Sequence, residues 1–467
     1  MNPKNQPSRR SFLKGSAGLL AGAAVAANFN VSRMAHGAGS DLLKVALIGC
    51  GGRGSGAAQN LLNVPNENIK IVAVADAFED KARKSADNLR KHKDQVDISD
   101  DRVFFGLDAY KKAIDCGVDM VILATPPGFR PMQYMAAVQA GKNVFMEKPC
   151  CTDAPGYRLL LEANKIADEK NLKVGVGLQR HHQPGYQETV KRIQDGAIGR
   201  ILFLRAQWNG SSIWYRPRTK EMTEMQYQVT NWYHFVAFSG DNICEQHVHN
   251  LDVCNWVMND HPIEANGMGG CTQRYLGDHR GQGQIFDHHF VEFTYKDGAK
   301  MYSQCRHIPN TMGGVFESAH GTEGSSNCSS TISDKDGKNK FPQVADAKSA
   351  QKAPEKAAGK HKRGQGGMSP YDQEHIDLVK AIRSNEKCNE GHYGADSSFT
   401  AVLGRMATYS GQSVKWDDAV KFGPAELPET LAWDALPKAL PDKNGDYPIP
   451  MPGVYKAYVA QGGAKKA

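Results

Sequence analysis

Residues 244–252 read CEQHVHNLD, which places two histidines and two carboxylates within nine positions. Side chains of these types can hold a metal ion, pass protons to and from a substrate, or cover the surface of a helix. The choice depends on secondary structure. A strand would align residues 245, 247 and 249 for a metal cage, whereas a helix would align only 245 and 249.

A helix is the structure that the sequence pattern predicts for this segment and the residues after it. Apolar residues recur there at helical spacing, and Asp241 precedes them as a potential cap. On a helix Glu245, His249 and Asp252 share one face, while His247 points elsewhere. We therefore predict no metal site here. His249 suits the role of general base or acid, because imidazole titrates near neutrality.

A glycine-rich turn lies between a predicted buried strand and a predicted helix. Gly49, Gly51 and Gly54 form a G-x-G-x-x-G pattern, which lets a backbone approach a pyrophosphate at a helix N-terminus. A second strand, at residues 69–75, ends at Asp76. Its carboxylate would accept a hydrogen bond from a ribose 2′-hydroxyl and repel a 2′-phosphate. The pattern predicts a site for NAD, with NADP disfavoured.

Strands and helices alternate after this turn, which predicts a doubly wound parallel sheet. Ligands of such sheets bind at the carboxyl ends of the strands. We therefore expect cofactor contacts from the glycine-rich turn and from the residues that end each strand. These residues are Gly49, Gly51, Gly52, Arg53, Gly54, Asp76, Thr125, Pro126, Glu147 and Lys148.

From about residue 43 onwards, the chain resembles the Gfo/Idh/MocA oxidoreductases, which include glucose–fructose oxidoreductase and inositol dehydrogenase. The resemblance rests on the glycine pattern, on Glu147-Lys148-Pro149 after a strand, and on a carboxylate four residues before a histidine. It implies that Lys148 lies beside the nicotinamide and the substrate hydroxyl, and that Glu245 and His249 complete the catalytic set. Glu245 departs from the family's usual aspartate, and its extra methylene shifts the carboxylate.

The resemblance also implies a second, α+β domain with a large, open, mostly antiparallel sheet. Gln179 and Arg180 follow a strand at the position where the family has a polar pair near cofactor and substrate. Trp232 and Tyr233 belong to a stretch of aromatic, Arg and Asn residues that suits stacking on sugar rings and equally suits a contact between subunits. We expect substrate contacts from Arg180, Trp232, Tyr233 and Asp252, and Asp252 could also orient His249.

The chain begins with a pattern typical of an export signal. Residues 8–14 read SRRSFLK, a twin-arginine motif, and an apolar stretch follows at residues 15–27. This predicts recognition by the twin-arginine export machinery and a periplasmic or otherwise exported protein. The net charge of +7 comes largely from this region and a lysine-rich stretch, so we do not expect nucleic-acid binding.

The sequence divides into four predicted regions. A homo-oligomer, either dimer or tetramer, is implied by the exposed sheets of the family. The regions are 1–40 for signal and linker, 41–173 for the dinucleotide domain, 174–423 for the second domain with a surface insertion at 333–368, and 424–467 for an irregular tail that wraps the domain or a neighbouring subunit.

Export limits the reactions that we expect. Free NAD is expected to be scarce outside the cytoplasm, and the twin-arginine route exports folded proteins, so the cofactor should stay bound and be recycled. We predict an NAD-dependent oxidoreductase acting on CH–OH groups of a carbohydrate. Two alternatives remain open: a glycosidase-like cycle of oxidation, elimination, hydration and reduction, and a non-catalytic sugar-binding protein on the same fold.

Overall fold

The computed structural model describes residues 41–272, 282–340 and 368–458 of the 467-residue chain. The export motif and most of the predicted insertion at 333–368 lie outside these residues. Residues 43–467 form one of two units, and every helix and strand described below belongs to it. Within the described ranges, no helix is both long enough and apolar enough to cross a bilayer.

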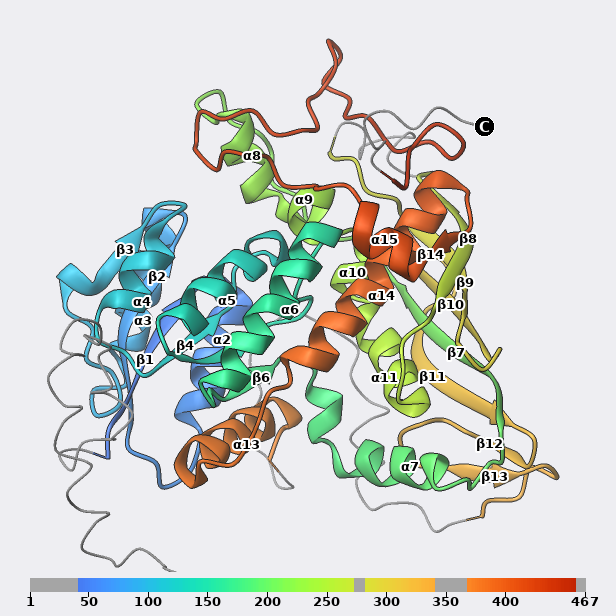
Figure 1. Ribbon diagram of the computed structural model, residues 1–467. Helices are drawn as coiled ribbons and strands as arrows, with labels where there is room; N and C mark the ends of the chain where they lie inside the picture. The colour runs from blue at the N-terminus through green and yellow to red at the C-terminus, as the bar shows by residue number, and fades with distance from the viewer. Residues whose placement is uncertain (1–40, 273–281, 341–367, 459–467) are drawn as a thin grey trace, which may run out of the picture. The chain divides into compact units, whose positions relative to one another are not determined.

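A six-stranded parallel sheet occupies the first part of the chain, in the order β3-β2-β1-β4-β5-β6 (Figure 1). Its strands are short apolar runs that are buried on both faces, as parallel strands require. They are β1 (Leu43–Ile48), β2 (Ile69–Asp76), β3 (Val103–Phe105), β4 (Met120–Leu123), β5 (Asn143–Met146) and β6 (Val174–Val176).

The structure moves one predicted boundary. The strand β6 pairs with β5 in the first sheet, so the dinucleotide domain continues past residue 173, where we had ended it. We assign β6 to the dinucleotide domain because it is the edge strand of the first sheet and does not belong to the second sheet. The helices of this domain are α2 (Gly52–Leu62), α3 (Glu79–Leu89), α4 (Ala109–Asp115), α5 (Arg130–Gln139) and α6 (Ala154–Glu169), with 3-10 turns η1 (Asp100–Arg102) and η2 (Pro127–Phe129).

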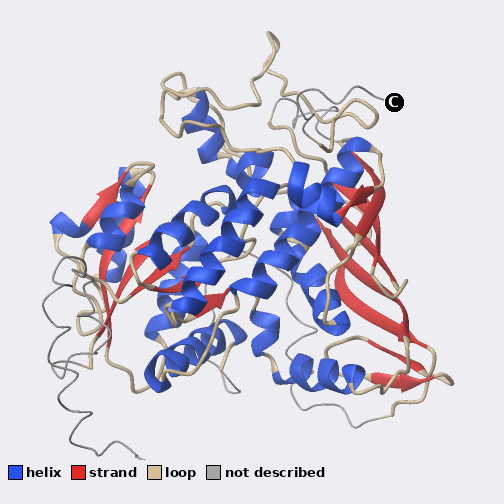
Figure 2. Cartoon of the chain, viewed as in Figure 1, coloured by secondary structure: helices blue, strands red, loops and turns tan. Residues whose placement is uncertain are grey.

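A second sheet has eight strands in the order β13-β12-β11-β7-β10-β9-β8-β14. Only the β7–β10 pair is parallel, so the sheet is mostly antiparallel as predicted. In the described part of the chain, helices lie against one face of this sheet (Figure 2). The strands are β7 (Ile201–Gly210), β8 (Glu264–Gly270), β9 (His288–Thr294), β10 (Lys300–His307), β11 (Gly314–Gly321), β12 (Gly324–Ser326), β13 (Ile332–Asp334) and β14 (Val414–Lys415).

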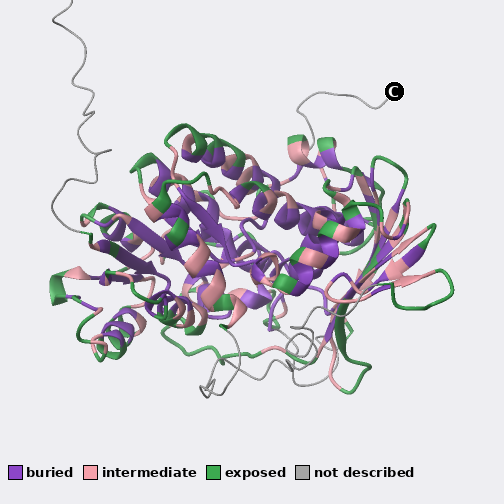
Figure 3. Cartoon of the chain, turned by 90° about the horizontal axis from the view of Figure 1, so that it is seen from below, coloured by how far each residue is buried: buried purple, intermediate pink, exposed green. Residues whose placement is uncertain are grey.

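The helix α14 (Gly391–Ser410) joins the two domains, since it packs on α6 on one side and on β8 on the other. Almost every one of its residues is buried, and Figure 3 shows buried residues along the helices and strands of this interior. The other helices of the second domain are α7 (Pro184–Gln194), α8 (Glu224–Thr230), α9 (Val236–Ser239), α10 (Asn242–Glu245), α11 (Val248–Met258), α13 (Pro370–Ser384) and α15 (Trp416–Phe422), with turns η3 (Gln179–His182) and η4 (Trp232–His234).

The helix predicted around CEQHVHNLD is two helices, α10 and α11, separated at Gln246 and His247. Asp241 caps the first, as predicted, by accepting a hydrogen bond from the Asn242 backbone N–H. The hydrogen bonds change register at the break, because the N–H groups of both Gln246 and His247 bond to the carbonyl of Asn242. A helical period in the sequence does not reveal such a break, because apolar residues recur at helical spacing on both sides of it.

The chain returns to the first domain after the second sheet. The helix α13 packs on α2 and on β6, so a segment far along the sequence borders the dinucleotide-binding turn. The described part of the tail, residues 424–458, contains no helix or strand, as predicted, and runs along α8 (Figure 1).

Candidate active site

A cavity of about 480 Å³ lies where the carboxyl ends of the first sheet meet the helices of the second domain. Most of the residues predicted to contact cofactor or substrate line it. They are Gly49, Gly51, Gly52, Arg53, Asp76, Thr125, Pro126, Glu147, Lys148, Trp232, Glu245 and His249. The cavity therefore combines side chains from two domains. Lys148 of the first domain and Glu245 and His249 of the second are about a hundred residues apart in sequence.

One end of the cavity is built to take a dinucleotide. Gly51 precedes α2 without a side-chain cap, and a Cβ there would meet nothing within 4 Å, so the first-turn N–H groups are open to an anion. Gly54 does not line the cavity. A Cβ on Gly54 would come within 1.8 Å of the Gly49 carbonyl oxygen, so this glycine allows α2 to pack closely on β1.

Asp76 ends β2 at the same end of the cavity. Its carboxylate accepts hydrogen bonds from the N–H groups of Cys50, at 2.7 Å, and of Phe78, at 3.0 Å. These bonds fix the carboxylate beside the glycine-rich turn, where it can accept further bonds from ribose hydroxyls. The glycines and Asp76 together fit NAD.

The strand ends are tied together by Arg130, which the sequence did not single out. This buried guanidinium donates to the carbonyl oxygens of Leu123 (2.7 Å), Thr125 (2.7 Å) and Glu147 (2.9 Å). Burial lowers the pKa of Arg130 to about 10, so it remains charged at neutral pH. The Glu147 carboxylate is paired with Arg53 at 2.9 Å. This ion pair offsets the cost of burying the Glu147 side chain.

Lys148 and Glu245 meet at the centre of the cavity. The Lys148 ammonium donates to the Glu245 carboxylate at 3.1 Å and to the Glu245 backbone carbonyl at 2.5 Å. Both side chains are nearly buried, with 12% and 11% of their side-chain surface exposed. The extra methylene of Glu245 lets its carboxylate fold back beside its own carbonyl, so that both groups hold the same ammonium.

His249 lies in the first turn of α11 and lines the same cavity. Its ring stacks on Trp208 of β7, with ring centres 5.9 Å apart. Its Nδ1 is buried and has no hydrogen-bond partner among the described residues, which leaves Nε2 to meet a ligand. Burial, and then the charges of Lys148 and Arg180, hold the pKa of His249 well below its usual value. The imidazole is therefore neutral near pH 7.

Two predicted substrate residues have other partners. Asp252 accepts hydrogen bonds from His181 Nε2 (2.9 Å) and the Ser397 hydroxyl (2.8 Å), so it neither lines the cavity nor orients His249. Asp252 is almost completely buried among these partners. Arg180 is also absent from the lining, because its guanidinium forms a buried ion pair with Glu317 of β11.

Two further predicted residues do not line the cavity themselves. Gln179 donates to the hydroxyl of Tyr371, which does line it, so its contact with the cofactor stays a prediction. The hydroxyl of Tyr233 bonds to His307 at 2.9 Å and its ring is buried, so only Trp232 of that pair reaches the cavity. His247, which had no predicted function, bonds to Ser303 of the second sheet at 2.8 Å, and burial lowers its pKa to about 3.

Several lining residues were missed by sequence reasoning. Lys81 and Phe78 follow Asp76, and position alone could have suggested them. Arg216 lies in the aromatic stretch that was noted without assigning this arginine a contact. Tyr371, on α13, lies over Arg53 with the guanidinium 5.1 Å from the ring centre. Nothing in the sequence marks Tyr371, because it reaches the site only through the return of α13 to the first domain.

A model of an oxidoreductase family with an NAD-binding Rossmann fold matches residues 43–178, and a model of the Gfo/Idh/MocA C-terminal domain matches residues 186–326. The chain belongs to the Gfo/Idh/MocA family. A model of the twin-arginine translocation signal sequence matches residues 6–26. The predicted family, the NAD site in the first domain and the export signal are confirmed.

Characterised Gfo/Idh/MocA relatives resemble part of the chain. The scyllo-inositol 2-dehydrogenase (NAD(+)) of Bacillus subtilis (strain 168) is 26% identical over 232 residues, which are 49% of this chain and 57% of that protein. An inositol 2-dehydrogenase/D-chiro-inositol 3-dehydrogenase of Shouchella clausii (strain KSM-K16) is 28% identical over 219 residues, which are 47% and 54%. The matched region spans little more than half the length of these relatives.

Solved structures share the fold over more of the chain. Levoglucosan dehydrogenase in complex with NADH and levoglucosan superposes with a TM-score of 0.60 and 18% identity, covering 80% of this chain and 99% of that one. The aldose-aldose oxidoreductase of Caulobacter crescentus gives 0.57 and 17%, again covering 80% and 99%. These likenesses confirm the predicted fold class of a Rossmann domain followed by a mostly antiparallel sheet domain.

Proposed function

We propose that this protein is an exported NAD-dependent oxidoreductase that acts on a secondary alcohol of a sugar or cyclic polyol. The observation that carries the proposal is the meeting of Lys148, Glu245 and His249 in one cavity with the dinucleotide-binding turn. Trp232 and Trp214 add aromatic surface to the same cavity, which suits the C–H faces of a sugar ring. The inositol dehydrogenases among the relatives support a polyhydroxylated substrate.

Lys148 is proposed to hold the reacting hydroxyl. Its ammonium is a fixed positive charge inside a protected cavity, so it can stabilise negative charge that develops on the substrate oxygen. Glu245 keeps the ammonium in place through its carboxylate and its carbonyl. When NAD is bound, its nicotinamide supplies the acceptor for the hydride that leaves the substrate carbon.

His249 is proposed to take the proton of the same hydroxyl. A general base must be unprotonated at the working pH, and burial and neighbouring cations keep this imidazole neutral. Its buried Nδ1 has no hydrogen-bond partner among the described residues, so no carboxylate bonded to that nitrogen raises the basicity of the ring. In the reverse direction the protonated ring would return the proton to the substrate oxygen.

The cofactor is proposed to remain bound between turnovers. The export signal supports a destination outside the cytoplasm, where we expect free NAD to be scarce, and the periplasm is the proposed destination. A retained cofactor must be reoxidised in place by a second carbonyl substrate or by the later step of a cycle on one substrate. A glycosidase-like cycle is one form of this, and the experiment below distinguishes it.

The test begins with protein purified after export. A nicotinamide absorbance or fluorescence signal that survives gel filtration is expected. The protein is then incubated with a panel of cyclic polyols, free sugars and glycosides, and both cofactor reduction and release of reducing ends are followed. Reduction of bound NAD by a polyol or sugar supports the proposal. Release of reducing ends without net reduction indicates the glycosidase-like cycle, and binding without either change indicates a sugar-binding protein.

A further inference from the structure

The second domain supplies part of the wall at the dinucleotide end of the cavity. We call residues 214–232 the cap. Trp214, Arg216 and Thr230 of the cap line the cavity together with Phe78 and Lys81, which follow Asp76 in the first domain. The cap thus reaches the part of the cavity where the fold places the adenosine and pyrophosphate of a dinucleotide.

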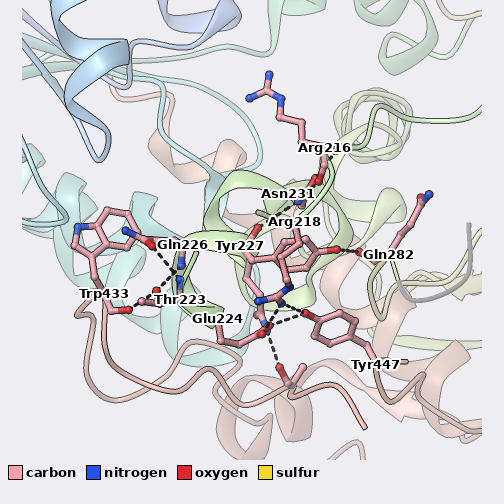
Figure 4. A network of polar contacts seen from close by, with 12 residues as sticks. Arg216, Arg218, Thr223, Glu224, Gln226, Tyr227, Asn231, Gln282, Trp433 and Tyr447 are labelled. Atoms are coloured by element: carbon pink, nitrogen blue, oxygen red, sulfur yellow. Dashed lines mark hydrogen bonds and ion pairs between the residues drawn. The ribbon is translucent and has the colours of Figure 1, made fainter. Parts of the chain in front are cut away.

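The backbone of Arg216 is clamped by one buried side chain. Asn231, which is completely buried, accepts a hydrogen bond from the Arg216 N–H and donates one to the Arg216 carbonyl, both at 2.9 Å. Figure 4 shows the Arg216 guanidinium extending away from this clamp and from the rest of the polar network. The clamp therefore fixes the backbone of an arginine whose charged end remains available.

Arg216 and Lys81 form no close ion pair among the described residues, although the Asp76 carboxylate attracts Lys81. In the described part of the chain, neither side chain forms a hydrogen bond or a close ion pair. The Arg216 guanidinium lies 5.2 Å from the ring centre of Trp214, and the Lys81 ammonium lies 4.4 Å from that of Phe78. Other cations of the cavity are already paired, Arg53 with Glu147 and Lys148 with Glu245. Among the described residues, Arg216 and Lys81 are therefore the cations at this end of the cavity that are available to bind an anion.

The two cations also act on each other. Burial lowers the pKa of Lys81; the Asp76 carboxylate opposes this shift, and Arg216 adds a smaller lowering effect. Two like charges held within electrostatic reach of each other are costly, and an anion between them offsets that cost. The pyrophosphate of NAD carries two negative charges and would lie at the N-terminus of α2, next to the ribose that Asp76 is placed to bind.

A second segment holds the cap against the first domain. We call residues 427–447 the strap. The Trp433 carbonyl accepts a hydrogen bond from Thr223, and the Trp433 ring packs on Phe78 at 5.2 Å. The Tyr447 hydroxyl donates to Glu224 at 2.6 Å, and Glu224 also pairs with Arg218 of the cap (Figure 4). Through Trp433 and Tyr447, the strap thus connects Phe78 of the first domain to the cap, which carries Arg216.

We infer that Arg216 is a cofactor-binding residue supplied by the second domain, and that it contacts the pyrophosphate of NAD and slows its release. The inference rests on the proposed retention of the cofactor and assigns that retention to one side chain. Asn231 is a positioning residue for this contact, and the strap keeps the cap closed over the dinucleotide.

The test compares Arg216→Ala and Arg216→Lys with Lys220→Ala. Lys220 is an exposed cation in the same cap that does not line the cavity, so its removal controls for the loss of one positive charge. Affinities are measured by titration with NADH and with ADP-ribose, and NADH dissociation by stopped-flow displacement. We expect Arg216→Ala to weaken both ligands by roughly 10-fold or more, with Arg216→Lys intermediate and Lys220→Ala close to the parent.

ADP-ribose separates this inference from the proposed reaction, because it carries the pyrophosphate but no nicotinamide. Equal loss of ADP-ribose and NADH affinity supports a pyrophosphate contact even in a protein that oxidises no sugar. Unchanged ADP-ribose affinity, or a loss no larger than that of Lys220→Ala, overturns it. Weakening confined to NADPH also overturns it, since Arg216 would then bind a 2′-phosphate.

Discussion

Lys148 and His249 reach the same cavity from different domains, yet of these two only Lys148 has a hydrogen-bond partner among the described residues. Lys148 is held by Glu245, so its position is set before a substrate arrives. His249 is held by stacking and burial, so its ring nitrogen must find its partner in the substrate. This difference leads to two predictions at the scale of single residues.

Removal of either group should abolish most of the activity. Lys148→Ala and His249→Ala are each expected to lower kcat/KM by at least ~100-fold, because both act on the proton and charge of one hydroxyl. Lys142→Ala is the matched control: this lysine lies at the opposite end of β5 and bonds to the Val118 carbonyl. It should stay within about twofold of the parent. Near-normal turnover of both active-site variants would contradict the assignment.

In the pH profile of kcat/KM, we expect no fall near pH 6.5 of the kind that protonation of a histidine with an ordinary pKa would cause. The pKa of His249 is well below 6.5, so the ring is already unprotonated over the range from neutrality to mildly acid pH. We therefore expect kcat/KM to remain level between about pH 6 and 7.5. The measurement is an initial-rate profile in constant-ionic-strength buffers. A limb near pH 6.5 that is absent from residual activity of His249→Ala would contradict a depressed pKa.

The residue types that do chemistry were predictable, whereas their partners were not. Lys148, Glu245 and His249 follow from a strand end and a helical period, which are local features. Asp252 and Arg180 looked equally suitable in sequence, but a buried charge needs a buried partner, and His181 and Glu317 supply them from other elements. Such partners depend on packing between elements, which one sequence does not specify.

At the scale of elements, the glycines of the first turn divide into two roles. Gly51→Ala should fold normally, because its Cβ meets nothing within 4 Å, but the added methyl occupies the approach to the pyrophosphate. We expect NADH affinity to fall at least about 10-fold with little change in thermal stability. Gly54→Ala should instead cost about 1–3 kcal/mol or more in folding, since its Cβ overlaps the Gly49 carbonyl.

Titrations by calorimetry and thermal melts distinguish these two glycine variants. The pair serves as its own control, because both variants add the same single methyl group within one turn. A Gly51→Ala variant that melts early, or a Gly54→Ala variant that melts normally and only loses NADH, would reverse the roles assigned to the two positions.

The return of α13 to the first domain is stabilised by a charged histidine. His182 in η3 bonds to Asp377 of α13 at 2.7 Å and pairs with Glu390 at 3.2 Å. Burial alone would lower the pKa of His182, but these carboxylates raise it to about 10. A raised pKa in the folded protein stabilises it fully below about pH 6.5, and this contribution is lost as the pH rises through 10.

Thermal melts from pH 6.5 to 10 should therefore show a fall in stability that His182→Gln reduces. The variant removes the titrating group while keeping a side chain that can form a hydrogen bond, so its curve should be flatter than that of the parent. Parallel curves for the two proteins would show that His182 is not the group that titrates. The sequence could not have indicated this contact, because η3 and α13 are separated by nearly two hundred residues.

At the scale of the whole molecule, the outer face of the second sheet has features of an interface. Met268, Phe290 and Phe316 lie in one row across neighbouring strands on this face, in register through Gln304 and Gln207, and are 75%, 43% and 36% exposed. In the described ranges, the helices lie against the opposite face of this sheet (Figure 2). An exposed apolar row of this kind is typical of a surface that another subunit covers.

We propose that the occupant is a second copy of this chain. The next row on the same face carries Glu292, Tyr302 and Arg205 in register, so both signs of charge lie on one surface. A two-fold axis brings the same surface of each copy together. The arginine of one copy can then pair with the glutamate of the other. A self-complementary face therefore favours a dimer, or a tetramer built from dimers.

The Met268→Asp/Phe290→Asp double variant should convert the oligomer into monomer, because it places two unpaired carboxylates at the centre of the buried face. Leu436→Asp is the control, since Leu436 is 69% exposed and belongs to the tail rather than to a strand of the sheet. Light scattering coupled to gel filtration measures the mass of each protein. A parent chain that runs as a monomer, or a double variant that keeps the parent mass, would exclude this face as the interface.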